Sequence, residues 1–171
     1  MKLNALLAAG LFAGVASTAT AGQSVYTATL DGSSESSPNS STGTGTAIVT
    51  IDSDQLTMRV QESFSNLAAG VTASHIHCCT SAPDTGTAGV ATTTPTFTDF
   101  PSGVMSGTYD HTFDMTQASS YNSAFITAND SVNGAFQALV AGLNAGTAYA
   151  NIHSTAFPMG EIRGFLHAAP I

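Results

Sequence analysis

The chain has 171 residues, only 8% of them charged, and eleven acidic residues against three Lys and Arg give a formal net charge of −8. A phosphate backbone repels so acidic a chain, which argues against nucleic-acid partners. Ser, Thr, Gly and Ala replace charged residues, as is typical of exported β-proteins with threonine on pleated strands and glycine in turns.

The N-terminal segment 1–21 has the pattern of a secretory signal. The positive start Met1-Lys2 is followed by an apolar stretch and by small residues that end in Ala19-Thr20-Ala21. This pattern predicts cleavage before Gly22, a mature domain over 22–171, and a secreted or periplasmic location. The alternative is a retained anchor, but the apolar stretch is short for a membrane span, so no stable span is expected after cleavage.

Alternation of apolar and polar residues predicts that most of the mature chain forms β-strands. The strands predicted over 43–51 and 55–64 are expected to pair as a hairpin, joined by the turn Asp52-Ser53-Asp54. A long irregular loop with several prolines is expected between the fourth strand and the next long one. In chain order, the predicted strands cover 24–30, 43–51, 55–64, 71–78, a short piece near 88–92, then 104–115, 147–153 and 161–166.

Helical spacing replaces this alternation after residue 116. Thr116 is expected to cap a first short helix over 117–128. A second helix is expected over 132–144, with Gly146 near its end. Strands, a helical crossover and further strands predict an all-β fold, an antiparallel Greek-key β-sandwich with one or two short helices in a late crossover.

Three histidines form the sharpest candidate site. His75 and His77 lie two apart in a predicted strand, where side chains at i and i+2 share one face roughly 7 Å apart. His153 ends another predicted strand that could pair beside the first, and three imidazoles suit copper or zinc. The alternative is that these histidines bond to backbone carbonyls and hold loops. His111 and His167 are weaker candidates, because neither lies at a ligand-like spacing.

The only cysteines, Cys78 and Cys79, directly follow the histidine pair. Export permits their oxidation, although adjacent Cα atoms, ~3.8 Å apart across a trans peptide, are closer than an ordinary disulfide prefers. A vicinal disulfide or buried thiols that shape the loop are one interpretation. A redox pair or soft ligands for copper(I) are the other, and the ligand interpretation makes Cys79 a weaker metal candidate.

Glu161 and Arg163 share one face of the last predicted strand, two residues apart. Buried charges persist only when they are paired, so a structural ion pair is the favoured interpretation, formed with each other or with neighbours. A catalytic role is the alternative.

Several short motifs are spread over the mature chain, and in them it resembles the CHRD domain family, the module repeated in chordin. The resemblance implies an exported binding module without established enzyme activity. Met159 stands where the family commonly has glycine, and its thioether near His153 is a further weak candidate ligand. The motifs are Tyr26-Thr27-Ala28-Thr29-Leu30, Thr42-Gly43-Thr44-Gly45-Thr46-Ala47, Ser74-His75-Ile76-His77, Tyr149-Ala150-Asn151-Ile152-His153, Phe157-Pro158-Met159-Gly160 and Glu161-Ile162-Arg163-Gly164.

The chain is also similar, more loosely, to copper–zinc superoxide dismutase, in which an H-x-H pair and a late histidine bind copper. The corresponding residues here are His75, His77 and His153, but no histidine is placed to bridge two metals and no zinc-ligand cluster follows. This similarity implies a sandwich of the immunoglobulin or superoxide dismutase type. Three functions remain open: a non-catalytic exported protein that binds copper or zinc, a copper-dependent redox enzyme, and a structural extracellular domain without metal. The sequence does not identify the partner of such a module, which is expected to be a protein or a component of the envelope.

Overall fold

The computed structural model describes residues 22–170, so the predicted signal 1–21 lies outside the described residues. Within this described range, eight strands pair antiparallel in one sheet of order β4-β6-β7-β1-β2-β3-β5, with β8 beside β1. No helix within 22–170 is long and apolar enough to span a membrane. The elements are β1 (Gln23–Asp31), β2 (Thr44–Asp52), β3 (Thr57–Ser65), β4 (Val71–His77), β5 (Gly107–Asp114), a 3₁₀ turn (Ala118–Ser120), α1 (Ser123–Ala128), α2 (Val132–Ala145), β6 (Tyr149–Ser154), β7 (Ile162–Phe165) and β8 (His167–Ala168).

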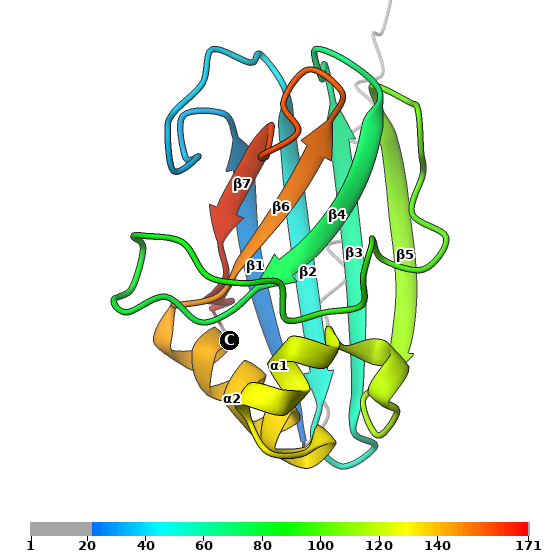
Figure 1. The fold of residues 1–171 in the computed structure, drawn as a ribbon, viewed down its shortest axis with the longest axis vertical. Coiled ribbons are helices and arrows are strands. Elements are labelled where there is room, and N and C mark those ends of the chain that lie inside the picture. The colour runs from blue at the N-terminus through cyan, green and yellow to red at the C-terminus, as the bar shows by residue number, and fades with distance from the viewer. Residues whose placement is uncertain (1–21, 171) are drawn as a thin grey trace, which may run out of the picture.

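The sheet curls into a half-barrel, with β4, β6 and β7 in front of β2, β3 and β5 and the two helices at one end (Figure 1). The mostly β, antiparallel architecture with late helices is therefore confirmed. A sandwich of two separate sheets is not shown, because β7 pairs with β6 and also meets β1, which makes the strand order continuous.

The hydrophobic core fills the concave side of the half-barrel. Alternate residues of each strand point inward, which is the expected result of period-two alternation, and α2 adds Leu139 and Leu143 from the helical end. The largest side chains with under 2% exposure are Tyr26, Leu30, Ile51, Met58, Ile76, Phe97, Met115, Leu139, Leu143, Ile152, Ile162 and Leu166. On β4 and β6, the residues that alternate with the buried Ile76 and Ile152 therefore face the outer side of the sheet.

The segment between β4 and β5 follows the free edge of β4. The amides of Ala91 and Phe97 donate to the carbonyls of Ile76 and Ser74, at 2.9 and 3.0 Å, and Val71 donates to Val104 at 2.9 Å. These bonds cover an edge strand that would otherwise expose unpaired backbone groups. They also bring loop carbonyls beside the outer face of β4.

Three local predictions need correction. The expected strand near 88–92 forms only isolated bridges, His77 to Val90 and Thr92 to Tyr121, because its backbone bonds to β4 intermittently. The strand predicted over 104–115 begins later, at Gly107.

The first helix is also shorter than predicted. Thr116 does not cap it, because its amide and hydroxyl both donate to Asp114 Oδ1, at 2.9 and 2.6 Å, and form a turn. The helix begins at Ser123, where Asn122 Oδ1 accepts from the Ala124 amide at 3.0 Å. The second helix is confirmed, with Ser131 as its N-cap and Gly146 in a left-handed conformation at its end.

Glu62 is a carboxyl group inside the core, on the inward face of β3. It accepts a 2.9 Å bond from the Ser74 hydroxyl, and its other oxygen is buried without a partner in the described part of the chain. Burial raises the Glu62 pKa from 4.5 to about 8, so the folded domain holds it protonated at neutral pH. Its stabilising contribution is complete below about pH 4.5 and is lost as pH rises towards 8, since only the unfolded chain ionises in that range.

The Glu62→Gln variant is therefore expected to lose less stability than wild type between pH 5 and pH 9. Urea denaturation at pH 5, 7 and 9 measures the two free energies of unfolding. Other groups titrate equally in both chains and cancel in the difference. Parallel pH curves for the two proteins would contradict the buried, protonated state of Glu62.

Candidate metal centre

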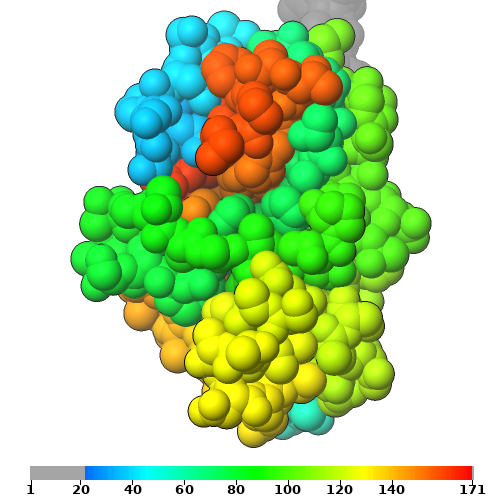
Figure 2. Space-filling model, viewed as in Figure 1, coloured from blue at the N-terminus to red at the C-terminus, as the bar shows by residue number. Residues whose placement is uncertain are grey.

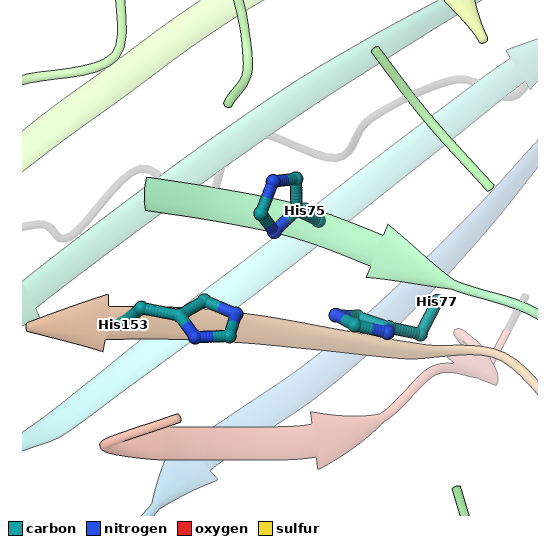
Figure 3. Close-up of side chains that lie close together, drawn as sticks. All are labelled: His75, His77 and His153. Carbon is teal, nitrogen blue, oxygen red and sulfur yellow. The ribbon is translucent and has the colours of Figure 1, made fainter. Parts of the chain in front are cut away.

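His75, His77 and His153 lie on the outer face of neighbouring strands β4 and β6. On β4, His75 and His77 flank Ile76, which is fully buried in the core. Their imidazoles therefore point to the opposite face of the strand, away from the core. The antiparallel register pairs Ala73 with His153 and His75 with Asn151, which sets His153 diagonally beside His75. The three rings point toward one another in the close-up (Figure 3).

The ring separations confirm that the two strands bring the three histidines together. Ring centroids are 5.4 Å apart for His75 and His153, 5.8 Å for His75 and His77, and 6.2 Å for His77 and His153. One nitrogen from each ring lies within 4.8 Å of the others. Three nitrogens about 2.0–2.1 Å from a common ion would need only small movements from these positions.

Each imidazole uses one nitrogen to bond a backbone carbonyl. His75 Nε2 donates to Pro95 at 2.6 Å, His77 Nδ1 to Ala88 at 2.9 Å, and His153 Nδ1 to Pro158 at 3.0 Å. A carbonyl only accepts, so these nitrogens carry the proton and fix the tautomer of each neutral ring. The opposite nitrogens, His75 Nδ1, His77 Nε2 and His153 Nε2, are buried and find no hydrogen-bond partner among residues 22–170.

Burial also keeps the three rings neutral. It is the largest cause lowering the pKa of His75 and of His153 below 6.5, and it lowers the pKa of His77 to about 4. A charged form would be poorly solvated there, and each additional charge would repel the others. Neutral imidazole with an available lone pair is the form that binds a metal ion.

The weaker candidates lie outside this group. His111 is on β5, between Tyr109 and Phe113, with ring centroids 6.1 and 4.6 Å away. Met159 is 90% exposed. His167 is exposed and meets Asp84, with a nitrogen–oxygen distance of 2.8 Å.

Cys79 is also outside the group, because it is joined to Cys78 by a disulfide. The sulfurs of both cysteines lie toward α2, with Cys79 Sγ 3.6 Å from the Ala138 carbonyl oxygen. Gly142 of α2 packs against both sulfurs, where any Cβ would overlap them. The disulfide therefore contacts the helix rather than the imidazoles.

Glu161 and Arg163 are buried and have partners, but not each other. Glu161 Oε1 accepts from the Ser41 hydroxyl at 2.5 Å and from the Ala68 amide at 2.6 Å, which ties two loops to the start of β7. Arg163 lies 3.9 Å from a carboxylate oxygen of Glu35 and donates to the Ser34 and Gly86 carbonyls. The partner Glu35 was not foreseen, because it lies in a Ser-rich loop with no local signal.

Tyr149 is a second neighbour of the site that sequence reasoning missed. It pairs directly with His77 in the register, and the two rings stack at 4.7 Å with an interplanar angle of 6°. Its position four residues before His153, on the same strand face, is a signal that would have found it.

The family model of the CHRD domain matches residues 26–166. The chain belongs to the CHRD domain family. The matched segment of this CHRD domain runs from within β1 to the residue after β7, and it includes the three histidines of the candidate site, Glu161 and Arg163. No curated protein and no solved structure gives a significant match to the chain.

Proposed function

We propose that this CHRD-domain protein is exported and binds one transition-metal ion, copper or zinc, through three histidines. The ligand atoms would be His75 Nδ1, His77 Nε2 and His153 Nε2. The observation that carries the proposal is that these three buried nitrogens lack partners while the opposite nitrogen of each ring is bonded to a carbonyl.

The arrangement fits a metal ion on energetic grounds. A buried acceptor without a partner costs about 1–3 kcal/mol, and the site holds three of them on adjoining side chains. A metal ion would satisfy all three at once. Ligating histidines commonly donate their other ring N–H to a carbonyl or carboxylate, and each of these rings donates to a carbonyl.

A non-catalytic binding role is the reading we favour. The three nitrogens proposed as ligands are almost inaccessible to solvent. The segments 32–43, 80–100 and 154–161 surround the outer face of β6 and β7 (Figure 2). A copper redox enzyme on a Greek-key sandwich like that of superoxide dismutase would need an open coordination position. A purely structural domain would leave three costly unpaired nitrogens.

Export to the periplasm or the medium is part of the proposal. The signal-like segment 1–21 supports it, and so does the Cys78–Cys79 disulfide, because disulfides persist in oxidising compartments. An extracellular or envelope protein is the proposed kind of partner.

The test is the metal content of the purified protein after incubation with Zn²⁺ or Cu²⁺ and desalting. About one ion per chain is expected for wild type, because three imidazoles define one site. The His75→Ala/His77→Ala variant should retain almost none, and His111→Ala should retain the wild-type amount. Equal metal in the double variant, or none in wild type, would contradict the proposal.

A further inference from the structure

We propose that Arg163 and Tyr149 are positioning residues for the histidine site, where they hold the His77 imidazole and the loop that it bonds. The inference rests on the proposed metal-binding function. Its structural core is a stack of guanidinium, phenol and imidazole across three neighbouring strands.

The stack follows from the strand order β4-β6-β7. His77 on β4 stacks on Tyr149 of β6 at 4.7 Å. Arg163 on β7 places its Cζ 4.7 Å from the centroid of the same Tyr149 ring. Tyr149 therefore lies between the imidazole and the guanidinium, because its strand β6 lies between β4 and β7. Cation–π contacts of this kind gain strength when they are desolvated.

One short loop segment is bonded by all three members of the stack. The Ala88 carbonyl accepts from His77 Nδ1 at 2.9 Å and from the Tyr149 hydroxyl at 3.3 Å. Arg163 Nη1 donates to the Gly86 carbonyl, two residues earlier, at 3.1 Å. Tyr149 thus bonds the same carbonyl that fixes the tautomer of His77, and Arg163 bonds the loop two residues before it.

Arg163 is itself immobilised. Its side chain is 6% exposed, and its Nε donates to the Ser34 carbonyl and lies 3.9 Å from Glu35. Glu35 also accepts a 2.5 Å bond from Asn151, the residue paired with His75 across the strands. The carboxylate offsets the guanidinium charge, which would otherwise disfavour a cation in the neighbouring site.

The discriminating variant is Arg163→Met, which keeps the apolar stem and removes the guanidinium. Arg59→Met is the matched control, because Arg59 is half exposed and its guanidinium bonds the Asp110 carboxylate on β5 at 2.8 and 2.6 Å. Isothermal titration with Zn²⁺ alone should show a 10- to 100-fold rise in Kd for Arg163→Met, as for other supporting residues of metal ligands. Tyr149→Phe, which keeps the ring but loses the hydroxyl, should show a smaller rise.

A metal-free readout separates this inference from the proposed function. In ¹⁵N NMR of the metal-free protein, Arg163→Met should shift the His77 ring nitrogens and leave those of His153, which is held by Pro158, unchanged. Unchanged Kd together with unchanged His77 shifts would overturn the inference, and so would equal shifts in all three rings. Wild type that binds no zinc would refute the proposed function, while the NMR comparison would still decide the stack.

Discussion

Saturating Zn²⁺ is expected to raise the melting temperature of the mature protein by roughly 10 °C. A ligand that binds only the folded state adds about 4 kcal/mol of stability at a free concentration 1,000-fold above its Kd, and each kcal/mol moves a domain of this size by about 2–4 °C. The effect is large because zinc would satisfy three buried nitrogens that the metal-free fold leaves unpaired. Differential scanning calorimetry with and without zinc measures it.

Two histidine variants, one at the site and one outside it, provide the control for this result. His77→Ala removes one ligand and should abolish most of the rise, whereas His167→Ala changes an exposed ring that pairs with Asp84 and should keep it. The metal-free melting temperatures of the variants must be compared first, so that only the zinc-dependent difference is interpreted. An equal rise in His77→Ala and wild type would refute the three-histidine site.

Gly164→Ala is expected to destabilise the fold by about 3 kcal/mol or more, the upper end of the range for overpacking. Gly164 lies in β7, which connects the β4-β6 arm of the half-barrel to β1. A Cβ at this position would overlap the backbone carbonyl of Thr29 on β1, and a backbone group cannot rotate away as a side chain can. The free energy of unfolding from urea titration gives the measurement.

Gly89→Ala is the matched control for this substitution. No atom of residues 22–170 lies within 4 Å of the Cβ that alanine would add there, and the loop backbone does not have a positive φ at this glycine. Its stability is expected to stay within about 0.5 kcal/mol of wild type, as for most surface changes. Similar losses in the two variants would show that the contact between β7 and β1 tolerates a side chain.

A protein with this site would hold its metal on the outer side of a sheet, not in its core. The inward face is occupied by apolar side chains such as Ile76 and Ile152, while the alternating outward face carries the imidazoles. Loops supply the carbonyls that orient the rings. The stability of the core and the affinity of the site are thus set by different faces of the same strands.

The sequence alone determined the features that depend on local periodicity. Alternation located β1, β2, β3, β4 and β6 to within a few residues, because burial of one face selects every second side chain. The spacing of two residues put His75 and His77 on one face for the same reason. Helical spacing and Gly146 located α2, and the motif around Glu161 and Arg163 indicated the CHRD family that the family match confirms.

Only the tertiary structure decided which distant segments meet. The register of β4 with β6 brings His153 beside residues some 75 positions earlier, and the path of the loop along β4 selects Pro95 and Ala88 as the acceptors for His75 and His77. Two further features depend on the tertiary structure in the same way. Glu35 is the partner of Arg163, and the strands form one continuous sheet in place of two. Local periodicity fixes which way a side chain points but not what lies opposite, since that depends on how the whole sheet closes around its core.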